Sequence, residues 1–441
     1  MISSKPYSME RIRSCLDKAI DYVCQSIDSY SAAPGTAFTR NRIFTAPTVM
    51  NILIQFQNKG VKSELCDFMG SDIVPTDSAF CQQRQKLDPE AMRAVLLKMN
   101  QLLSRNMKTL NGYRLLACDG SDINIPHNSN DSETYHQTRD WKGYNQLHLN
   151  ALYDVLNEIY QDVNIDTATK TREAEALIDM VRNQNYPAKS IIICDRGYEK
   201  YNLIANLLES KQKFVIRVKD ITSSTSILAH VPIPDQDEFD IQVTRVLTYT
   251  YTKEIMQHRD KYVPLNKITN GHFEYIDDDH PFYKMQFRVV RFKITEDTYE
   301  CLITNLKKSE FSAKDLKMAY HYRWSEENGF RQLKWEVGMV YFHSRKRSNL
   351  MQEIYASLVM FNFTRFLTIN TDIVESKDRK YDHKANFVTA ITNARLFIKG
   401  VITAGQMEER IKKFLIPLRS GRSFKRSLRP QSAKPLNYKA A

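Results

Sequence analysis

The chain has 441 residues, which exceeds the size of one hydrophobic core and predicts two or three folded domains. Its 63 Lys and Arg residues outnumber its 51 Asp and Glu residues, and the formal charge of +12 favours a polyanionic partner, with nucleic acid as the first candidate. Because no run reaches roughly 18 consecutive apolar residues and the N-terminal segment lacks an apolar signal core, we expect no membrane association and a cytoplasmic location.

Residues 1–108 are predicted to form a helical N-terminal DNA-binding domain, because Pro and Gly separate segments with helical periodicity. The expected helices cover 8–29, 47–68, 77–85 and 89–105. The third of them could present Gln82, Gln83, Arg84 and Lys86 to DNA, although an ordinary surface helix has the same polar pattern. Both interpretations stay open.

Residues 109–219 are predicted to form the first part of a mixed α/β core. Their apolar patterns give the order β-β-β-α-β-α-β. The expected strands are 114–118, 147–153, 159–165, 190–194 and 213–219, and the expected helices are 172–184 and 198–211.

The rest of the chain is predicted to hold an insertion and the second part of the core. Short alternating segments indicate a β-rich insertion at 220–298. The core then continues over 299–370 with a strand at 300–304 and a helix at 313–337, and a helical C-terminal region covers 371–441. The acid-free tail from Arg419 to Lys439 either adds affinity for phosphates or only raises solubility.

Several common types of site are missing from the sequence. The seven cysteines are scattered without a CxxC pair, so we expect reduced thiols in the core and no zinc site or disulfide framework. The histidines, such as His127, His136 and His148, show no metal-ligand spacing. The absence of GxxxxGK[ST] and GxGxxG phosphate loops argues against enzymes that use ATP or dinucleotides.

Two carboxylates directly follow apolar strands. Asp119 comes after the run 115–118, and Asp195 comes after the run 191–194. Ligands in open α/β sheets gather at strand C-termini, so neighbouring strands would place both acids at one edge. Their repulsion would be relieved by a hard divalent cation such as Mg²⁺. In the alternative interpretation, each aspartate only caps the next turn or helix.

A third acid lies on the long helix expected after the insertion. At about 100° per residue, one face of this helix carries Tyr320, Arg323, Glu327, Arg331 and Lys334 beside an apolar face. At the edge of the sheet Glu327 would complete a metal site, while the three cations and the tyrosine contact phosphates. The alternative is a solvated face with i,i+4 ion pairs.

Three acids in this arrangement fit two-metal phosphoryl transfer. One ion would activate water or a DNA 3′-hydroxyl, and the other would stabilise the leaving oxygen. Two neighbouring acids rank second as ligands. Asp122 points to the opposite side if its strand continues past Asp119, and Glu326 lies about 100° from Glu327 towards the apolar face.

Three motifs give the chain a family resemblance over roughly residues 110–365. It resembles the DDE transposases of bacterial insertion sequences, in the branch with the Y-R-E-K signature, at Asp119-Gly120-Ser121, Asp195-Arg196-Gly197-Tyr198 and Tyr320-x2-Arg323-x3-Glu327-x6-Lys334. The resemblance implies a ribonuclease-H-like mixed-sheet core interrupted by a β-rich insertion. It also implies that Asp119, Asp195 and Glu327 are the catalytic, metal-binding triad and that Tyr320, Arg323 and Lys334 contact phosphates.

The resemblance further implies the cofactor and the partners. The cofactor would be Mg²⁺, with Mn²⁺ able to replace it. The partners would be double-stranded DNA, as terminal inverted repeats and target, and a second copy of the chain in a dimer that bridges two ends, with a hairpin on the element end. The expected location is the bacterial cytoplasm, on nucleoid DNA. Two other functions stay open, which are a nuclease without joining activity and a catalytically inactive DNA-binding regulator.

The chain departs from the family at one point. Family members can hold a flipped base with a tryptophan in the insertion, but the tryptophans here are Trp141, Trp324 and Trp335. An aromatic residue of the insertion, namely Tyr275, Phe282 or Tyr283, could stack on a base instead.

Overall fold

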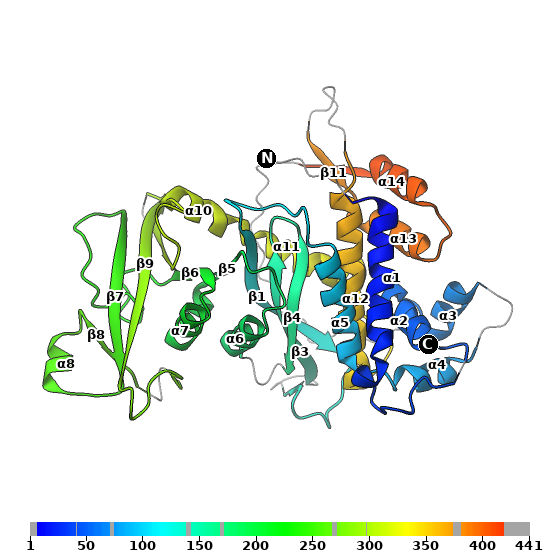
Figure 1. The fold of residues 1–441 in the computed structure, drawn as a ribbon, viewed down its shortest axis with the longest axis horizontal. Helices are drawn as coiled ribbons and strands as arrows, with labels where there is room; N and C mark the ends of the chain where they lie inside the picture. Colours follow the sequence, from blue (N-terminus) through cyan, green and yellow to red (C-terminus); the bar gives the residue numbers. More distant parts are fainter. Residues whose placement is uncertain are drawn as a thin grey trace.

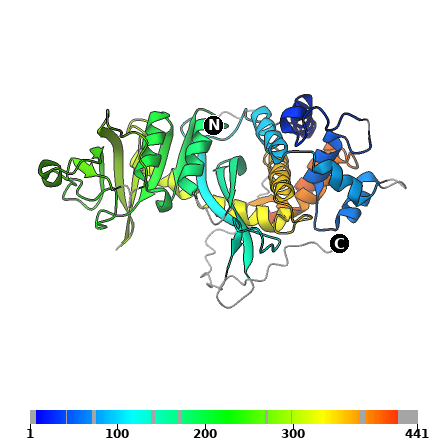
Figure 2. The same ribbon diagram turned by 90° about the horizontal axis from the view of Figure 1, so that it is seen from below.

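In the computed structural model, the chain forms an elongated molecule with three parts side by side (Figure 1). A β-rich part lies at one end, a mixed α/β part in the middle and a helical part at the other end, and a view turned by 90° shows the same order (Figure 2). The predicted basic tail and Trp141 lie outside the described residues. The structure describes residues 7–40, 42–70, 75–137, 143–167, 172–266, 271–296, 298–373 and 381–418.

A large mixed sheet joins the β-rich part to the α/β part. Its strands follow the order β2-β3-β1-β5-β6-β10-β9-β7-β8, and β4 pairs with β3. The strands are β1 Arg114–Ile125, β2 Tyr135–His136, β3 Tyr144–Asp154, β4 Ile159–Thr167, β5 Ser190–Cys194, β6 Lys213–Val218, β7 Phe239–Thr248, β8 Tyr262–Pro264, β9 Phe282–Thr295 and β10 Thr298–Thr304.

The centre of the sheet has the predicted mixed pairing. Strands β1, β5 and β6 are parallel, whereas β3 is antiparallel to both β1 and β4. Helices α6 (Glu173–Asn183) and α7 (Tyr201–Glu209) connect the parallel strands, as crossover connections require. The prediction of a ribonuclease-H-like mixed α/β core is therefore confirmed.

Two hydrophobic cores cover the two faces of this sheet. Side chains of a strand alternate between faces, so Leu115 and Ala117 of β1 enter one core while Leu116 and Cys118 enter the other. The first core includes the helical part, and the second includes α6, α7 and the insertion. Residues on the Leu115 side consequently face the helices that follow the insertion.

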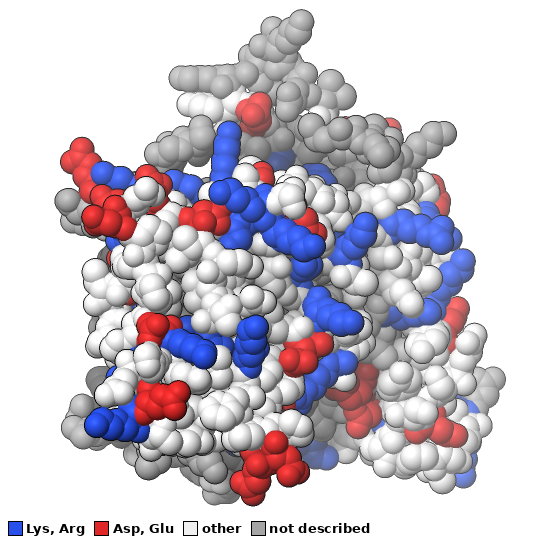
Figure 3. Space-filling view, turned by 60° about the vertical axis from the view of Figure 1, so that its left-hand side comes forward, with Lys and Arg blue, Asp and Glu red and all other residues white. Residues whose placement is uncertain are grey.

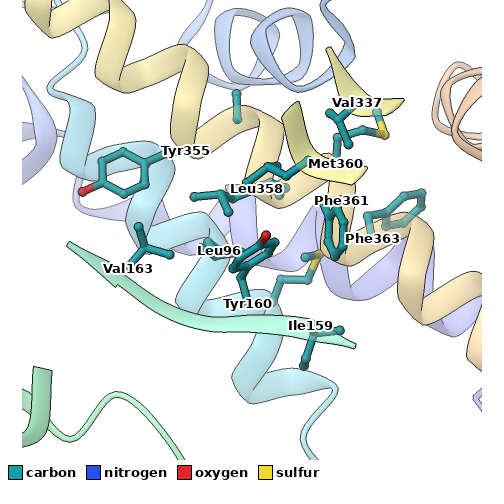
Figure 4. Close-up of a cluster of buried hydrophobic side chains, with 14 of the residues drawn as sticks. Leu96, Ile159, Tyr160, Val163, Val337, Tyr355, Leu358, Met360, Phe361 and Phe363 are labelled. Carbon is teal, nitrogen blue, oxygen red and sulfur yellow. The ribbon is translucent and has the colours of Figure 1, made fainter. Parts of the chain in front are cut away.

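The first core is built around helix α12 (Arg347–Ile369). Its side chains Leu358 and Phe361 lie beside Leu96 of α5 (Pro89–Leu102) and Tyr160 of β4, and the rings of Phe361 and Tyr160 are in contact (Figure 4). Almost every residue of α12 from Asn349 onward is buried within the chain. This apolar helix therefore belongs to the core, as the rule for helices apolar on every side predicts.

The helical part contains both ends of the described chain. Polar side chains cap several of its helices, because Ser8, Thr45, Thr76 and Asp88 each accept a backbone N–H of the first turn. The single helix predicted over 47–68 is wrong, since the chain leaves helical geometry after Gln55. The remaining helices are α1 Met9–Gln25, α2 Ala46–Gln55, α3 Val61–Met69, α4 Asp77–Arg84, α13 Phe387–Ile398 and α14 Ala404–Lys413.

The C-terminal region is not wholly helical. Strands β11 (His383–Ala385) and β12 (Leu415–Pro417) form a small antiparallel pair around α13 and α14. The prediction of an all-helical region missed this pair, because three-residue strands have no readable alternation.

The insertion extends the core sheet instead of forming a separate one. Its strands β7 and β9 pair along ten residues, and β9 pairs with β10, which pairs with core strand β6. Buried Arg288 of β9 donates to both carboxylate oxygens of Asp240 at 2.7 and 2.8 Å, which satisfies its charge inside this part.

The cysteines are all free, but they are not all in the core. Cys15, Cys118, Cys194 and Cys301 are buried, Cys24 and Cys81 are half-buried, and Cys66 is exposed. The prediction of a core thiol is thus wrong for Cys66, because α3 buries only Glu64 and Leu65. Separately, none of the described helices has the length and apolar character that a membrane crossing needs.

Candidate active site

The two aspartates lie next to each other in the central sheet. Parallel pairing of β1 with β5 ends at Cys118 and Cys194, so Asp119 and Asp195 follow the same rung of the ladder. The sequence prediction that β1 ends at Cys118 is wrong, because pairing with β3 carries the strand on to Ile125. Asp119 therefore lies inside β1, at the point where its other neighbour β5 stops.

Alternation places both aspartates on the Leu115 side of the sheet. There the Asp119 carboxylate accepts the Gly120 N–H at 2.9 Å, and the Asp195 carboxylate accepts the Gly197 N–H at 2.7 Å. Asp195 thus caps the short helical turn Arg196–Tyr198, which confirms the capping interpretation for this residue without removing it from the edge.

Acidic neighbours and burial disfavour the charged form of Asp119. Burial raises the pKa of Asp119 to about 6, and the charges of Asp195 and Glu173 act in the same direction. The Gly120 N–H and the Arg323 guanidinium oppose this rise. Crowded carboxylates of this kind become more stable when a cation joins them.

The long helix predicted over 313–337 is broken into three pieces. Helix α10 (Ala313–Tyr322) ends at a turn formed by Arg323 and Trp324, α11 (Ser325–Arg331) follows, and residues 332–337 form a π-helix. Because a π-helix has a wider turn, the spacing of 100° per residue does not hold throughout. The five side chains predicted on one face also differ in exposure, from buried Tyr320 before the turn at Arg323 and Trp324 to exposed Arg331 after it.

Two of the predicted cations reach β1 on either side of Gly120. The Arg323 guanidinium lies 3.7 Å from the Asp119 carboxylate, and the Lys334 ammonium donates to the Ser121 hydroxyl at 2.7 Å. Lys334 also donates to the Asp122 carbonyl at 2.6 Å. Arg323 further stacks near the rings of Tyr320 and Trp324, at 5.6 and 4.9 Å from their centroids.

Neighbouring glutamates of α11 occupy different environments. Glu326 is fully buried, and its carboxyl oxygens make no hydrogen bond to the described residues. Burial raises the pKa of Glu326 well above its usual value, with further contributions from Asp119, Cys118 and Asp195 that outweigh Arg323. Glu327 is half-buried and lies one turn after Arg323 and seven residues before Lys334, whose side chains both reach β1.

Next to Asp119 lies a row of charged side chains that the sequence analysis did not predict. His148 of β3 binds the Asp122 carboxylate at 2.8 Å and the Glu173 carboxylate at 3.2 Å. Burial lowers the pKa of His148, but the hydrogen bonds with Asp122 and Glu173 raise it overall to about 9. A Cβ atom on Gly120 would lie 2.4 Å from the His148 ring, so the imidazole packs directly against the backbone beside Asp119. In the sequence, Gly120 directly after Asp119 was the one sign that another side chain packs closely at this position.

The position of Asp122 agrees with its lower rank. Strand β1 continues past Asp119, and Asp122 points with His148 to the opposite face. Within the described ranges, no three His, Cys, Asp or Glu side chains lie close enough to hold a metal ion. The donors that do gather here are carboxylate oxygens, which is the ligand type that Mg²⁺ prefers.

The three aromatic candidates for base stacking differ in availability. The Tyr275 hydroxyl donates to Asn206 and the Tyr283 hydroxyl donates to Glu209, at 3.0 and 2.8 Å, and both rings pack on Phe273. Phe282 is 49% exposed. Phe282 is therefore the one exposed side chain of the three.

Comparisons with known proteins match the central half of the chain. The family model described as "Transposase DDE domain" matches residues 110–363, which include both strands with the aspartates and helix α11. No curated protein matches the chain. Among solved structures, a piggyBac transposase synaptic complex with hairpin DNA is 13% identical with a TM-score of 0.40, over 93% of this chain and 84% of that chain.

Proposed function

The chain belongs to the transposases that carry a DDE domain, and on this basis we propose that it cuts DNA at the inverted-repeat ends of an insertion sequence and joins them to target DNA. The observation that carries the proposal is the pairing of β1 with β5, which brings Asp119 and Asp195 to one edge of the sheet. Helix α11 packs on the same side of the sheet, and we propose that its Glu327 is the third acid.

We propose that Asp119, Asp195 and Glu327 hold divalent ions, with Mg²⁺ as the cofactor and Mn²⁺ able to replace it. The raised pKa of Asp119 supports this assignment, because burial and neighbouring carboxylates leave the site short of positive charge. When bound, such ions activate water or a 3′-hydroxyl and stabilise the leaving oxygen. The motif favours Glu327 over Glu326, and burial among apolar groups favours the neutral form of Glu326.

The basic residues of this region would orient the DNA. Exposed Arg331 can contact a phosphate without disturbing the fold. Arg323 and Lys334 already contact β1 beside Asp119, so they would act on the DNA strand that is cut. Lys and Arg side chains also cross the middle of the face in Figure 3, as a polyanionic partner requires. We further propose that two copies of the chain bridge the two ends of one element.

An excision and joining assay tests the proposed reaction. A marked DNA segment with the gene's own flanking ends is incubated with Mg²⁺ and either the wild-type protein, Asp119→Asn or Asp195→Asn. We expect joined product only from the wild type, with cleavage lowered more than about a hundredfold in both variants while end binding persists. Asp179→Asn is the matched control, because this exposed aspartate lies on α6.

The other outcomes separate the remaining functions. Cut ends without joined product would indicate a nuclease, and binding without cutting by the wild type would indicate an inactive regulator. Equal cutting by the wild type and both aspartate variants would place the reaction elsewhere in the molecule.

A further inference from the structure

A cationic hollow lies in the helical N-terminal part, outside the candidate active site. It has a volume of about 350 Å³ and opens where the loop before α2 meets the end of α4. None of the described residues that line it is acidic. They are Gly35, Thr36, Phe38, Thr39, Arg40, Arg42, Gln83 and Lys86.

The walls of the hollow are tied together by backbone contacts. Ser31 forms an isolated antiparallel bridge with Leu87, and the Ala32 N–H donates to the Lys86 carbonyl at 2.9 Å. On the loop side, the Gly35 N–H donates to the Asp28 carboxylate at 2.8 Å, with Gly35 at a φ of +72°. These contacts hold the loop and the end of α4 in a fixed relation, so the hollow is a built feature.

Its three cations carry uncompensated charge. Among the residues that the structure describes, Arg40, Arg42 and Lys86 make no ion pair, and all three side chains reach solvent. Gln83, which is only 8% exposed, also lines the hollow. Three cations without ion pairs around one hollow favour an anionic partner, to which the Gln83 amide could add a hydrogen bond.

The hollow is also fixed relative to the α/β core. Arg84, the residue after Gln83, turns inward and donates to Glu353, Gln352 and the Asn349 carbonyl of α12 at 3.0 to 3.1 Å. The hypothesis that Arg84 reads DNA from the surface is therefore wrong, because a buried carboxylate holds its guanidinium. The same inward contact anchors the end of α4 that carries Gln83.

We propose that this hollow binds a backbone phosphate of duplex DNA and so sets the position of the duplex on the protein. The inference rests on the proposed function, which makes DNA the substrate. Phosphate contacts fix register without reading sequence, and a group of cations with one amide donor suits that role. Anchoring to α12 transmits the position to the core, since α12 packs on β4 in the same hydrophobic cluster as α11.

Salt-dependent binding tests the hollow. The variant Arg40→Gln/Arg42→Gln/Lys86→Gln and the wild type are titrated with a duplex of the element's end and with an unrelated duplex, between about 50 and 200 mM salt. Removal of one phosphate-binding cation lowers the slope of log K against log salt by about 0.9. We expect the slope of the triple variant to fall by at least this amount, and equally with both duplexes. Lys62→Gln, an exposed cation of α3 without an ion pair to the described residues, should leave the slope unchanged.

Two further readouts decide between the outcomes. Circular dichroism should show the same fold for all variants, because the altered side chains are at the surface. Ethylation interference should reveal a phosphate whose modification blocks the wild type but not the triple variant. If the wild type cuts its ends, a triple variant with an unchanged salt slope would overturn the proposal for the hollow alone, as would weaker binding confined to one duplex. A wild type that binds neither duplex would overturn both proposals.

Discussion

At the scale of single residues, the adjacent glutamates of α11 differ in burial because they point in different directions from the helix. Glu326 points into the first core with its oxygens unpaired by the described residues, while Glu327 stays half-buried on the stripe that carries Arg323. Burial of a carboxyl group without a cation favours its neutral form. A neutral acid is a poor metal ligand, so the two positions should respond differently to the same substitution.

We therefore expect Glu327→Gln to abolish cleavage while Glu326→Gln retains it. The second change keeps the shape of the side chain, and burial already favours the neutral form of Glu326, which glutamine resembles. Mn²⁺ binding, followed by electron paramagnetic resonance, should weaken in Glu327→Gln and stay near wild type in Glu326→Gln. The reverse pattern would make Glu326 the third ligand and would assign Glu327 to the surface of the helix.

At the scale of elements, α11 is held against the sheet by a close approach at a glycine. A Cβ atom on Gly329 would lie 2.9 Å from the ring of Tyr153, and this tyrosine of β3 pairs with Ala117 of β1, two residues before Asp119. Tyr153 is buried, so its ring has little room to move. The glycine thus sets the distance between the helix with the glutamates and the strand with the first aspartate.

Gly329→Ala should lower both stability and cleavage. Overpacking against Tyr153 costs roughly 1 to 3 kcal/mol, and displacement of α11 moves Glu327 away from Asp119. Thermal unfolding and the excision assay measure the two effects. Gly405→Ala on α14 is the control, because nothing lies within 4 Å of its added Cβ, and it should stabilise by up to about 1 kcal/mol. Full activity of Gly329→Ala would show that the contact is not needed.

At the scale of the whole molecule, a buried charge network joins the N-terminal helices to the core. Arg84 of α4 pairs with Glu353 of α12 at 3.0 Å, and His343 lies between Glu353 and Glu64 of α3 at 3.1 and 3.5 Å. Burial raises the pKa of Glu353, but Arg84 and His343 outweigh burial and lower it to about 2. This buried ion pair thus joins segments that are more than 250 residues apart in the sequence.

Arg84→Met should destabilise the protein by roughly 3 to 5 kcal/mol at neutral pH, because the buried Glu353 carboxylate loses its Arg84 partner and keeps only its contacts with His343. A lowered folded pKa contributes stability above the unfolded pKa of 4.5, and this contribution is lost as pH falls towards about 2. The difference between wild type and variant should therefore shrink between these pH values. Denaturant unfolding at several pH values measures it, and a constant difference would contradict the assigned pairing.

The sequence by itself determined the elements whose signals are local. Apolar runs bounded by polar residues gave strand β5 at both ends, and they placed Asp119 and Asp195 directly after buried segments. The order of strands and helices followed, because periodicity distinguishes them within a few residues. The motif around Glu327 likewise depends only on spacing, and it led to the family that the comparisons support.

Only the tertiary structure decided features that depend on partners far along the chain. Strand β1 continues to Ile125 because β3 offers backbone groups beyond the end of β5, and no local pattern contains that information. The inward turn of Arg84 needs Glu353, and the burial of Glu326 needs the sheet beneath α11. Periodicity predicts which face of a helix or strand a side chain lies on, whereas strand pairing and burial depend on which distant segment packs against that face.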